Sequence, residues 1–262
     1  MPETILITGA TDGIGLLTAK TLVAEGHKVL IHGRNPPKLA AAAQDIGGDI
    51  ETYTADLTRM ADVHALVAEV RKAHTQLDVL INNAGVLKIA NPKTDDGYDA
   101  RFMVNTFAPY VLTRGLLPII PADGRIVNLS SAAQAPVDLE ALHGRKQYDD
   151  MGAYAQSKLA ITIWTQQLAK ELGAGPVVVA VNPGSLLASK MVKEGFGVAG
   201  NDLGIGAAIL REAAVGASFA GATGRYFDND SGAFANPHAA GMDSTHSTDV
   251  MNAINEAVAK IG

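Results

Sequence analysis

The chain has 262 residues, of which 47% are hydrophobic, and a formal net charge of −6. This length suffices to bury most of the unfolded surface in a core, whereas the acidic balance disfavours nucleic acid, which needs a basic face. The absence of cysteine excludes disulfides, thiolate metal sites and a cysteine nucleophile.

No export or membrane segment is evident in the sequence. Its first residues, MPETILITG, lack a basic region ahead of a long apolar run, so they do not predict a signal peptide. No apolar stretch approaches the ~18 residues that suggest a membrane span. We therefore expect a cytoplasmic protein without a membrane or nucleic-acid partner.

Short apolar runs alternate along the chain with longer amphipathic segments. The expected strands are Thr4–Thr8, Lys28–His32, Ile50–Thr54, Leu77–Ile81, Arg125–Leu129 and Val177–Val181. The expected helices are Ile14–Ala24, Pro37–Ile46, Ala61–His74, Tyr98–Leu116, Ala153–Leu172 and Val250–Lys260. Such alternation predicts parallel strands joined by crossover helices. Because no repeat or low-complexity linker divides residues 1–262, we expect a single α/β domain: a doubly wound parallel sheet with helices on both faces.

Two stretches depart from this alternation. Residues 132–153 mix polar and apolar side chains without a clear period, and residues 227–249 are rich in Gly, Asn, Asp, Ser and His. Irregular segments of this length inside a compact domain are usually functional loops. The second stretch is therefore expected to form an irregular C-terminal loop.

A glycine-rich turn joins the first expected strand to the first expected helix. It reads Thr8-Gly9-Ala10-Thr11-Asp12-Gly13-Ile14-Gly15. Glycines allow close approach to a pyrophosphate, which the free N–H groups and dipole of a helix N-terminus stabilise. A simple tight turn is the alternative, but the position between strand and helix favours a dinucleotide site.

The end of the second expected strand bears on the choice between NADP and NAD. An NAD-selective site would place an acidic residue there, but the sequence has Arg34 and Asn35. A guanidinium suits a 2′-phosphate, although a solvated Arg at a helix start is an equally ordinary interpretation. Asp12 in the glycine turn opposes a 2′-phosphate. The sequence predicts NADP, with NAD as the alternative.

A tyrosine and a lysine four residues apart, Tyr154 and Lys158, share one face of an expected helix. This spacing alone indicates only a surface pair. Here it occurs in a fixed chain order with further motifs, namely the glycine turn, Asn82-Asn83-Ala84-Gly85, Asn105 and Ser130-Ser131. Together, from Thr8 to Gly184, the motifs resemble the short-chain dehydrogenase/reductase family, which has a Rossmann-like fold. The long segment after Ser131, with His32–Asn35 and Ser189-Lys190-Met191, resembles its retinol-dehydrogenase-like branch.

The resemblance implies four catalytic residues. Tyr154 would act as general acid in carbonyl reduction and as general base in alcohol oxidation. Lys158 would lower the pKa of that phenol and hold the nicotinamide ribose. Ser131, chosen over Ser130 because the family places its serine last in such strings, would bond the substrate oxygen. Asn105 would hold a water that links Lys158 to solvent.

The resemblance also implies further residues around the cofactor. Asp56 would contact the adenine with Leu57 beside the ring, although a helix N-cap explains Asp56 equally well. The predicted cofactor site comprises Gly9, Thr11, Asp12, Gly13, Ile14, Gly15, Arg34, Asn35, Asp56, Leu57, Asn83, Ala84, Gly85, Tyr154, Lys158, Pro183, Gly184 and Leu186. No metal site is expected, because the histidines show no paired ligand spacing.

The sequence thus predicts an oxidoreductase that transfers a hydride between NADP(H) and an alcohol or carbonyl substrate. A nucleotide-sensing protein of the same fold without turnover is the alternative. Residues 132–153 and 185–200 are expected to shape the substrate pocket. An apolar substrate is favoured by aromatic residues in this half of the chain, namely Trp164, Phe196, Phe219, Phe227 and Phe234. A homodimer or homotetramer is also expected from the resemblance.

Overall fold

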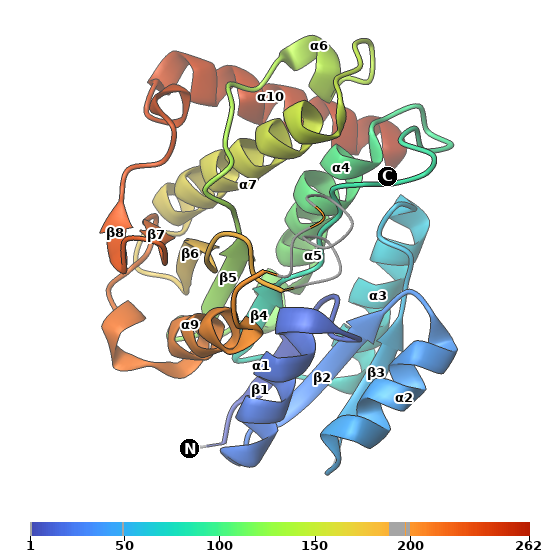
Figure 1. Ribbon diagram of the computed structural model, residues 1–262, viewed down its shortest axis with the longest axis vertical. Coiled ribbons are helices and arrows are strands. Elements are labelled where there is room, and N and C mark those ends of the chain that lie inside the picture. The colour runs from blue at the N-terminus through green and yellow to red at the C-terminus, as the bar shows by residue number, and fades with distance from the viewer. Residues whose placement is uncertain (1, 49, 189–196, 198–199) are drawn as a thin grey trace.

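A computed structural model describes residues 2–48, 50–188, 197 and 200–262. Its centre is an eight-stranded sheet in the order β3-β2-β1-β4-β5-β6-β7-β8, parallel throughout except for the last pair (Figure 1). The strands are β1 Thr4–Ile7, β2 Lys28–Gly33, β3 Ile50–Thr54, β4 Val79–Asn82, β5 Arg125–Leu129, β6 Val177–Asn182, β7 Tyr226–Asp228 and β8 Ala233–Ala235. This confirms the predicted doubly wound α/β domain.

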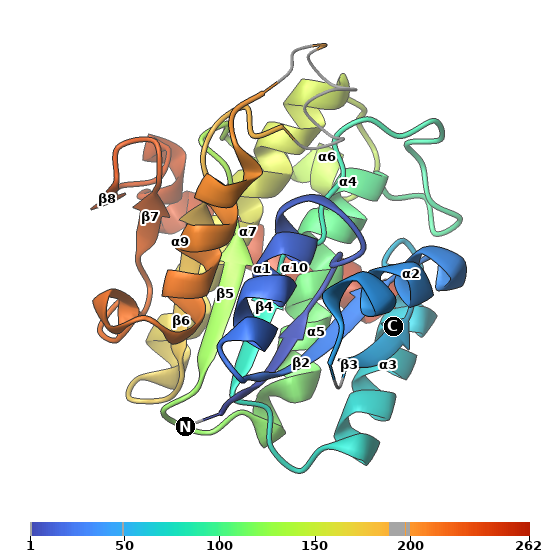
Figure 2. The ribbon, with the colours of Figure 1, turned by 60° about the horizontal axis from the view of Figure 1, so that its bottom comes forward.

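Helices cover both faces of the sheet (Figure 2). The longer ones are α1 Gly13–Ala24, α2 Pro36–Ile46, α3 Met60–Ala73, α5 Ala108–Leu116, α7 Asp150–Leu172, α9 Leu203–Val215 and α10 Ser244–Ile261. Side chains of α1, α2 and α9 pack in one core cluster, and those of α3, α5, α7 and α10 in a second. Within the described residues, no helix combines the length and apolarity that crossing a membrane requires.

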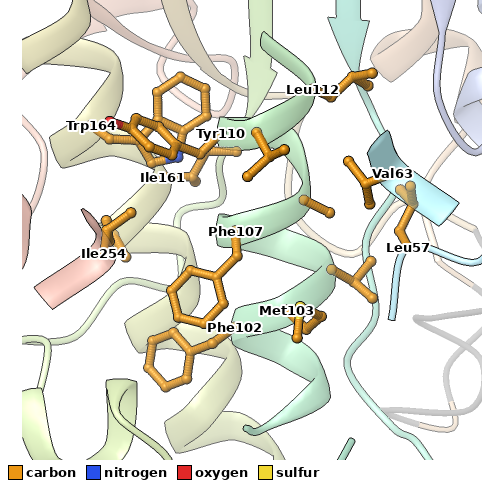
Figure 3. Close-up of a cluster of buried hydrophobic side chains, with 14 of the residues drawn as sticks. Leu57, Val63, Phe102, Met103, Phe107, Tyr110, Leu112, Ile161, Trp164 and Ile254 are labelled. Carbon is orange, nitrogen blue, oxygen red and sulfur yellow. The ribbon is translucent and has the colours of Figure 1, made fainter. Parts of the chain in front are cut away.

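The second core is built on α5 and α7 and is closed by α10 (Figure 3). Trp164 of α7 is fully buried and meets Tyr110 of α5 edge to face, with ring centroids 5.6 Å apart. Ile254 of α10 is also fully buried, and Asn255 accepts a hydrogen bond from the Tyr110 hydroxyl at 2.8 Å. The C-terminal helix is therefore an integral part of the domain.

The expected helix 98–116 is interrupted in the structure. A short helix α4, Ala100–Phe102, leads into a π-helical turn η1, Met103–Phe107, in which the Ala108 N–H donates to the Met103 carbonyl. Pro109 follows and has no N–H to donate to the Asn105 carbonyl, the partner it would have in an α-helix. The predicted helix is therefore confirmed over residues 100–116, with a π-helical turn that the sequence did not predict.

The C-terminal part is more regular than the sequence predicted. The expected irregular loop 227–249 contains most of β7, all of β8 and a 3-10 turn, η4 Ala239–Gly241. Helix α10 begins at Ser244, six residues before its predicted start, since the Asp243 side chain accepts from the N–H groups of Thr245 and His246. Helix α9 was not predicted. Its glycines fit a close approach: a Cβ on Gly206 would lie 2.6 Å from a Leu187 methyl carbon.

Candidate active site

A cleft of about 450 Å³ opens where β1, β2 and β4 end. This is the point at which the strand order reverses, where open α/β sheets bind ligands. Its wall contains most of the predicted cofactor residues: Gly9, Thr11, Asp12, Gly13, Ile14, Gly15, Arg34, Asn35, Asp56, Leu57, Asn83, Ala84, Gly85, Tyr154, Lys158 and Pro183. Gly184 and Leu186 are not part of this wall.

The glycine turn is fixed against the end of β4. Asn83 donates through Nδ2 to the carbonyls of Thr8 and Gly9, at 2.8 and 3.0 Å. The Thr8 hydroxyl accepts from the N–H groups of Asn83 and Ala84. Gly9 has φ +66°, and a Cβ there would lie 2.8 Å from Ala84 Cα. The turn therefore requires glycine at this position for both backbone conformation and space.

The residues after β2 and β3 have structural roles besides any contact with a cofactor. Asn35 caps α2, because its side chain accepts from the Lys38 N–H at 3.0 Å. Asp56 accepts from the Thr58 N–H and hydroxyl at 2.9 and 2.8 Å. The N-cap of α3 is Arg59, so the alternative of Asp56 as a helix cap was wrong. Asp56 instead stabilises the turn before α3.

The sequence did not predict three ionisable residues of the cleft wall, namely Lys38, Lys88 and His32. Lys38 and Lys88 join Arg34 as exposed cations of the cleft, against the carboxylates of Asp12 and Asp56. His32, buried within β2, also borders the cleft. Lys38 lies one helical turn after Arg34, a spacing that could have identified it. Lys88 belongs to none of the family motifs, and His32 is part of the segment His32–Asn35 that carries the resemblance but has no role assigned by it.

Helix α7 presents Tyr154 and Lys158 to the cleft. Asp149 caps the helix by accepting from the Gly152 N–H at 2.8 Å. Lys158 is buried and donates from Nζ to the Leu129 carbonyl at the end of β5, at 2.7 Å. Its Nζ lies 5.5 Å from the centroid of the half-buried Tyr154 ring. The pair thus lies inside the cleft that the glycine turn borders.

Burial shifts both groups toward their neutral forms. It raises the pKa of the Tyr154 phenol above 10.0, and a hydrogen bond with the Ser131 side chain lowers it in part. Burial also lowers the pKa of Lys158 from 10.5 to about 7. Desolvation is the larger of the two effects on Tyr154, so its pKa is raised on balance, and the expected lowering of this pKa by Lys158 stays a prediction.

Asn105 and Ser131 are not in the wall of the cleft. The Asn105 side chain accepts from the Val86 N–H at 2.9 Å and donates to the Val86 carbonyl at 3.0 Å. It also donates to the Ser157 hydroxyl at 2.9 Å. Its backbone carbonyl remains without an α-helical partner, because of Pro109. The Asn105 side chain thus fixes the η1 turn to the loop after β4 and to α7.

The two serines after β5 differ in their contacts. The Ser130 hydroxyl is buried against Thr162 Oγ1, at 2.7 Å, and the Lys158 carbonyl. The Ser131 hydroxyl accepts from the Ala133 N–H at 3.1 Å, and the Ser131 side chain lies close enough to the Tyr154 phenol to lower its pKa in part. Tyr226 of β7 donates to the Ser131 carbonyl. Ser131 is therefore the serine that faces the Tyr154 hydroxyl.

The turn after β6 is held by the loop between β7 and β8. Asp230 accepts from the N–H and hydroxyl of Ser185, at 2.7 and 2.5 Å, and Asn229 donates to the Pro183 carbonyl at 2.9 Å. Leu186 follows with φ +51° and is 45% exposed. Of the predicted substrate segment 185–200, residues 189–196, 198 and 199 lie outside the described part of the chain.

The predicted substrate segment 132–153 is folded against α7. Asp138 caps the short helix α6, Leu139–Leu142, and accepts from Lys146 Nζ and the Tyr148 hydroxyl, at 2.6 and 2.8 Å. Its own N–H donates to the side chain of Gln156 on α7 at 2.9 Å. These contacts make the segment an ordered wall beside Tyr154.

Comparisons with known proteins agree with this geometry. The model of the short chain dehydrogenase family matches residues 3–196. Human retinol dehydrogenase 13 is 35% identical over 193 residues, which are 70% of this chain and 58% of that protein. Human polyprenol dehydrogenase is 35% identical over 195 residues, 68% of this chain and 59% of that protein. The chain thus spans less than two thirds of the length of these relatives.

Solved structures share the fold. A protein from Mycobacterium paratuberculosis superposes with a TM-score of 0.82 at 26% identity, over 98% of this chain and 93% of that one. A short chain dehydrogenase from Burkholderia cenocepacia in complex with NADP gives a TM-score of 0.70 at 28% identity, over 88% and 97%. This chain belongs to the short-chain dehydrogenase/reductase family, near its retinol dehydrogenase members.

Proposed function

We propose that the protein is an NADP(H)-dependent oxidoreductase that interconverts an alcohol and a carbonyl compound. The observation that carries this proposal is the cleft that holds a glycine turn and the Tyr154–Lys158 pair in one wall. A nicotinamide cofactor bound there supplies or accepts the hydride. The protein has to orient the substrate, stabilise its oxygen and move a proton.

Tyr154 is the proposed acid and base. Its raised pKa keeps the phenol protonated at neutral pH, the form that donates to the oxygen of a carbonyl substrate. The Ser131 hydroxyl, beside the phenol, would stabilise the same oxygen. Lys158 stands beside the ring and would hold ribose hydroxyls. The Asn105 carbonyl, which Pro109 leaves without an α-helical donor, is the proposed site for the water of a proton relay toward Lys158.

NADP is the proposed cofactor, through Arg34 with Lys38 and Lys88 in the wall. With these three cationic side chains and the two carboxylates of Asp12 and Asp56, the wall has a positive excess. This charge suits the two extra negative charges of a 2′-phosphate. Similar short chain dehydrogenases from Burkholderia cenocepacia and Shigella flexneri, at 28% and 29% identity, are complexed with NADP. NAD remains the alternative, favoured by Asp12.

We infer an apolar substrate, on grounds other than the aromatic residues that first suggested it. Trp164 belongs to the α5–α7 core, and Phe219, Phe227 and Phe234 pack on one another with centroids 5.0–5.2 Å apart; Phe196 is outside the described residues. The exposed apolar side chain of Leu186 after the β6 turn supports the inference. So do the names of the relatives, retinol and polyprenol dehydrogenases.

The test is a titration with NADPH and NADH, followed by a carbonyl screen with the tighter cofactor. Tyr154→Phe should retain cofactor binding and lose turnover, whereas a nucleotide sensor would show binding without turnover even in the unsubstituted protein. Tyr110→Phe is the matched control, because it removes a phenol hydroxyl that bonds Asn255 outside the cleft. Unchanged turnover in Tyr154→Phe would refute the acid/base assignment. Preference for carboxylate-bearing carbonyls would refute the apolar substrate.

A further inference from the structure

His32 of β2 lies against the glycine turn and is only 2% exposed. Its Nδ1 accepts from the Gly9 N–H at 3.2 Å, and its Nε2 contacts the Ala55 carbonyl at 3.0 Å. Gly9 belongs to the turn after β1, and Ala55 to the loop after β3. From β2, the imidazole of His32 therefore connects the turn after β1 to the loop after β3, which are two separate sides of the cleft.

These contacts define the state of the ring. A backbone N–H can only donate, so Nδ1 has to be an unprotonated acceptor, and a carbonyl can only accept, so Nε2 has to carry the hydrogen. Both bonds are made together only by the neutral imidazole with its proton on Nε2. Burial lowers the pKa of His32, although the Asp56 carboxylate and the Ala55 carbonyl oppose this in part.

The bond to Gly9 acts on one residue of a turn that Asn83 and Thr8 also hold. Gly9 has a positive φ and no side chain, so its orientation depends on its neighbours. Asn83 fixes its carbonyl from the β4 side, and His32 fixes its N–H from the β2 side. On the other edge, Ala55 precedes Asp56 and Leu57, both in the cleft wall.

We propose that His32 is a positioning residue for the dinucleotide: its neutral imidazole sets the glycine turn and the Ala55–Leu57 loop at the separation that the cofactor needs. The inference rests on the proposed function. His32 acts through Gly9 and Ala55 and has no part in proton or hydride transfer. Its loss should therefore weaken cofactor binding and leave the catalytic step unchanged.

Two substitutions separate the two bonds. In His32→Asn the amide oxygen occupies about the position of Nδ1 and can still accept from Gly9. In His32→Gln the amide nitrogen reaches about the position of Nε2 and can still donate to Ala55, but the Gly9 N–H loses its acceptor. A merely structural histidine would make both variants equally unstable and equally weak in binding.

The measurement is the Kd for NADPH by fluorescence, with kcat at saturating NADPH for the best carbonyl of the screen. We expect His32→Gln to raise the Kd about tenfold and His32→Asn to raise it less than about threefold, from the loss of one backbone hydrogen bond. In both, kcat should stay within about twofold. His27→Asn is the matched control, because His27 also accepts a backbone N–H through Nδ1, from Glu3 at 3.1 Å, outside the cleft.

The outcomes distinguish this inference from the proposed function. If the unsubstituted protein binds no NADPH and reduces no carbonyl, the proposed function fails. If it binds NADPH but His32→Gln binds equally well, or if kcat falls with Kd unchanged, the assignment of His32 fails. A ¹⁵N spectrum of the folded protein provides a readout independent of binding: an unprotonated Nδ1 is expected, and a protonated Nδ1 would overturn the proposal.

Discussion

Lys158 is a single functional residue whose burial lowers the stability of the folded protein. The side chain is 4% exposed, and its hydrogen bond goes to a neutral carbonyl, so no carboxylate compensates for the loss of solvation. Burial consequently lowers its pKa to about 7. The buried amine binds a proton less readily than the same amine in the unfolded chain. It therefore lowers the free energy of unfolding at any pH at which the unfolded chain binds this proton.

Lys158→Met is therefore expected to stabilise the cofactor-free protein while it abolishes turnover. Between pH 7 and 10.5 the unfolded chain binds a proton that the folded one does not, so the stability of the native protein rises with pH over this window. The gain from Met should be largest at and below pH 7, roughly 3 kcal/mol after the lost hydrogen bond is subtracted, and should vanish toward pH 10.5. Urea unfolding at several pH values measures it.

Lys170→Met is the control for this prediction, since Lys170 lies exposed on the same helix. It should change the free energy of unfolding little at any pH. A Lys158→Met protein that is less stable than the native one at pH 7 would contradict the buried-amine account.

Arg34 provides a test of cofactor choice. Arg34→Ala removes a guanidinium from the cleft wall and should raise the Kd for NADPH about tenfold or more, from the loss of charge-assisted bonds, while the Kd for NADH changes little. Calorimetric titration with both cofactors measures the difference. Arg59→Ala, at a side chain 66% exposed that pairs with Asp62, is the control. Equal weakening of both cofactors would place Arg34 away from the 2′-phosphate.

The sequence predicted those site residues whose function is local. The glycine turn and the Tyr154–Lys158 pair are contiguous motifs on one strand end or one helix, so their order along the chain and the family resemblance were enough to predict them. His32 could not be recognised, because its partners Gly9 and Ala55 lie 23 residues away on either side. The charge state of Lys158 also depends on burial by several elements, which no spacing records.

At the scale of elements, the sequence predicted the six central strands and missed β7, β8 and α9. Strands β7 and β8 have three residues each, too few for an alternating pattern. Helix α9 is apolar around much of its circumference and contains two glycines in its first turn, which weaken any helical prediction. Its stability comes from packing on α1 and the sheet, and this is tertiary information.

Helix α10 is expected to contribute strongly to stability through Ile254. Ile254→Ala should lower the free energy of unfolding by about 2–5 kcal/mol, because the buried side chain would leave a cavity between α10 and α7. Thermal or urea unfolding measures this. Asn252→Ala, at an exposed position of the same helix, should have little effect. Comparable losses in the two variants would show that the α10 interface contributes little.

The ordered wall of residues 132–153 depends on Asp138. Lys146 and Tyr148 hold its pKa at about 2, below the ordinary 3.8, so its stabilising contribution is fully present at neutral pH and is lost as the pH falls from 3.8 through about 2. Asp138→Ala should speed amide hydrogen exchange in this segment and raise the KM for the carbonyl severalfold, with the KM for NADPH unchanged. Glu140→Ala, which breaks an exposed pair with Arg145, is the control. A changed NADPH KM would argue against a substrate wall.

At the scale of the whole molecule, α10 affects how copies of the chain can associate. The family resemblance implies a subunit interface on the face formed by α5 and α7, but here α10 packs on α7 and contacts α6. The expected homodimer or homotetramer remains a prediction, and it would have to form through another surface. The same packing joins the core behind the cleft to the C-terminal part of the chain.

Cofactor binding should therefore stabilise the domain as one unit. A ligand that binds only the native state adds about 2.7 kcal/mol at a hundredfold excess over its Kd, which for a domain of this size corresponds to roughly 5–10 °C in Tm. NADPH should produce this shift in a single transition, and its removal by gel filtration should reverse it. NADH at the same concentration should give a smaller shift, because it lacks the phosphate that Arg34, Lys38 and Lys88 attract. Two separate transitions, only one of them moved by NADPH, would contradict a single core; equal shifts with both cofactors would contradict the preference for NADP.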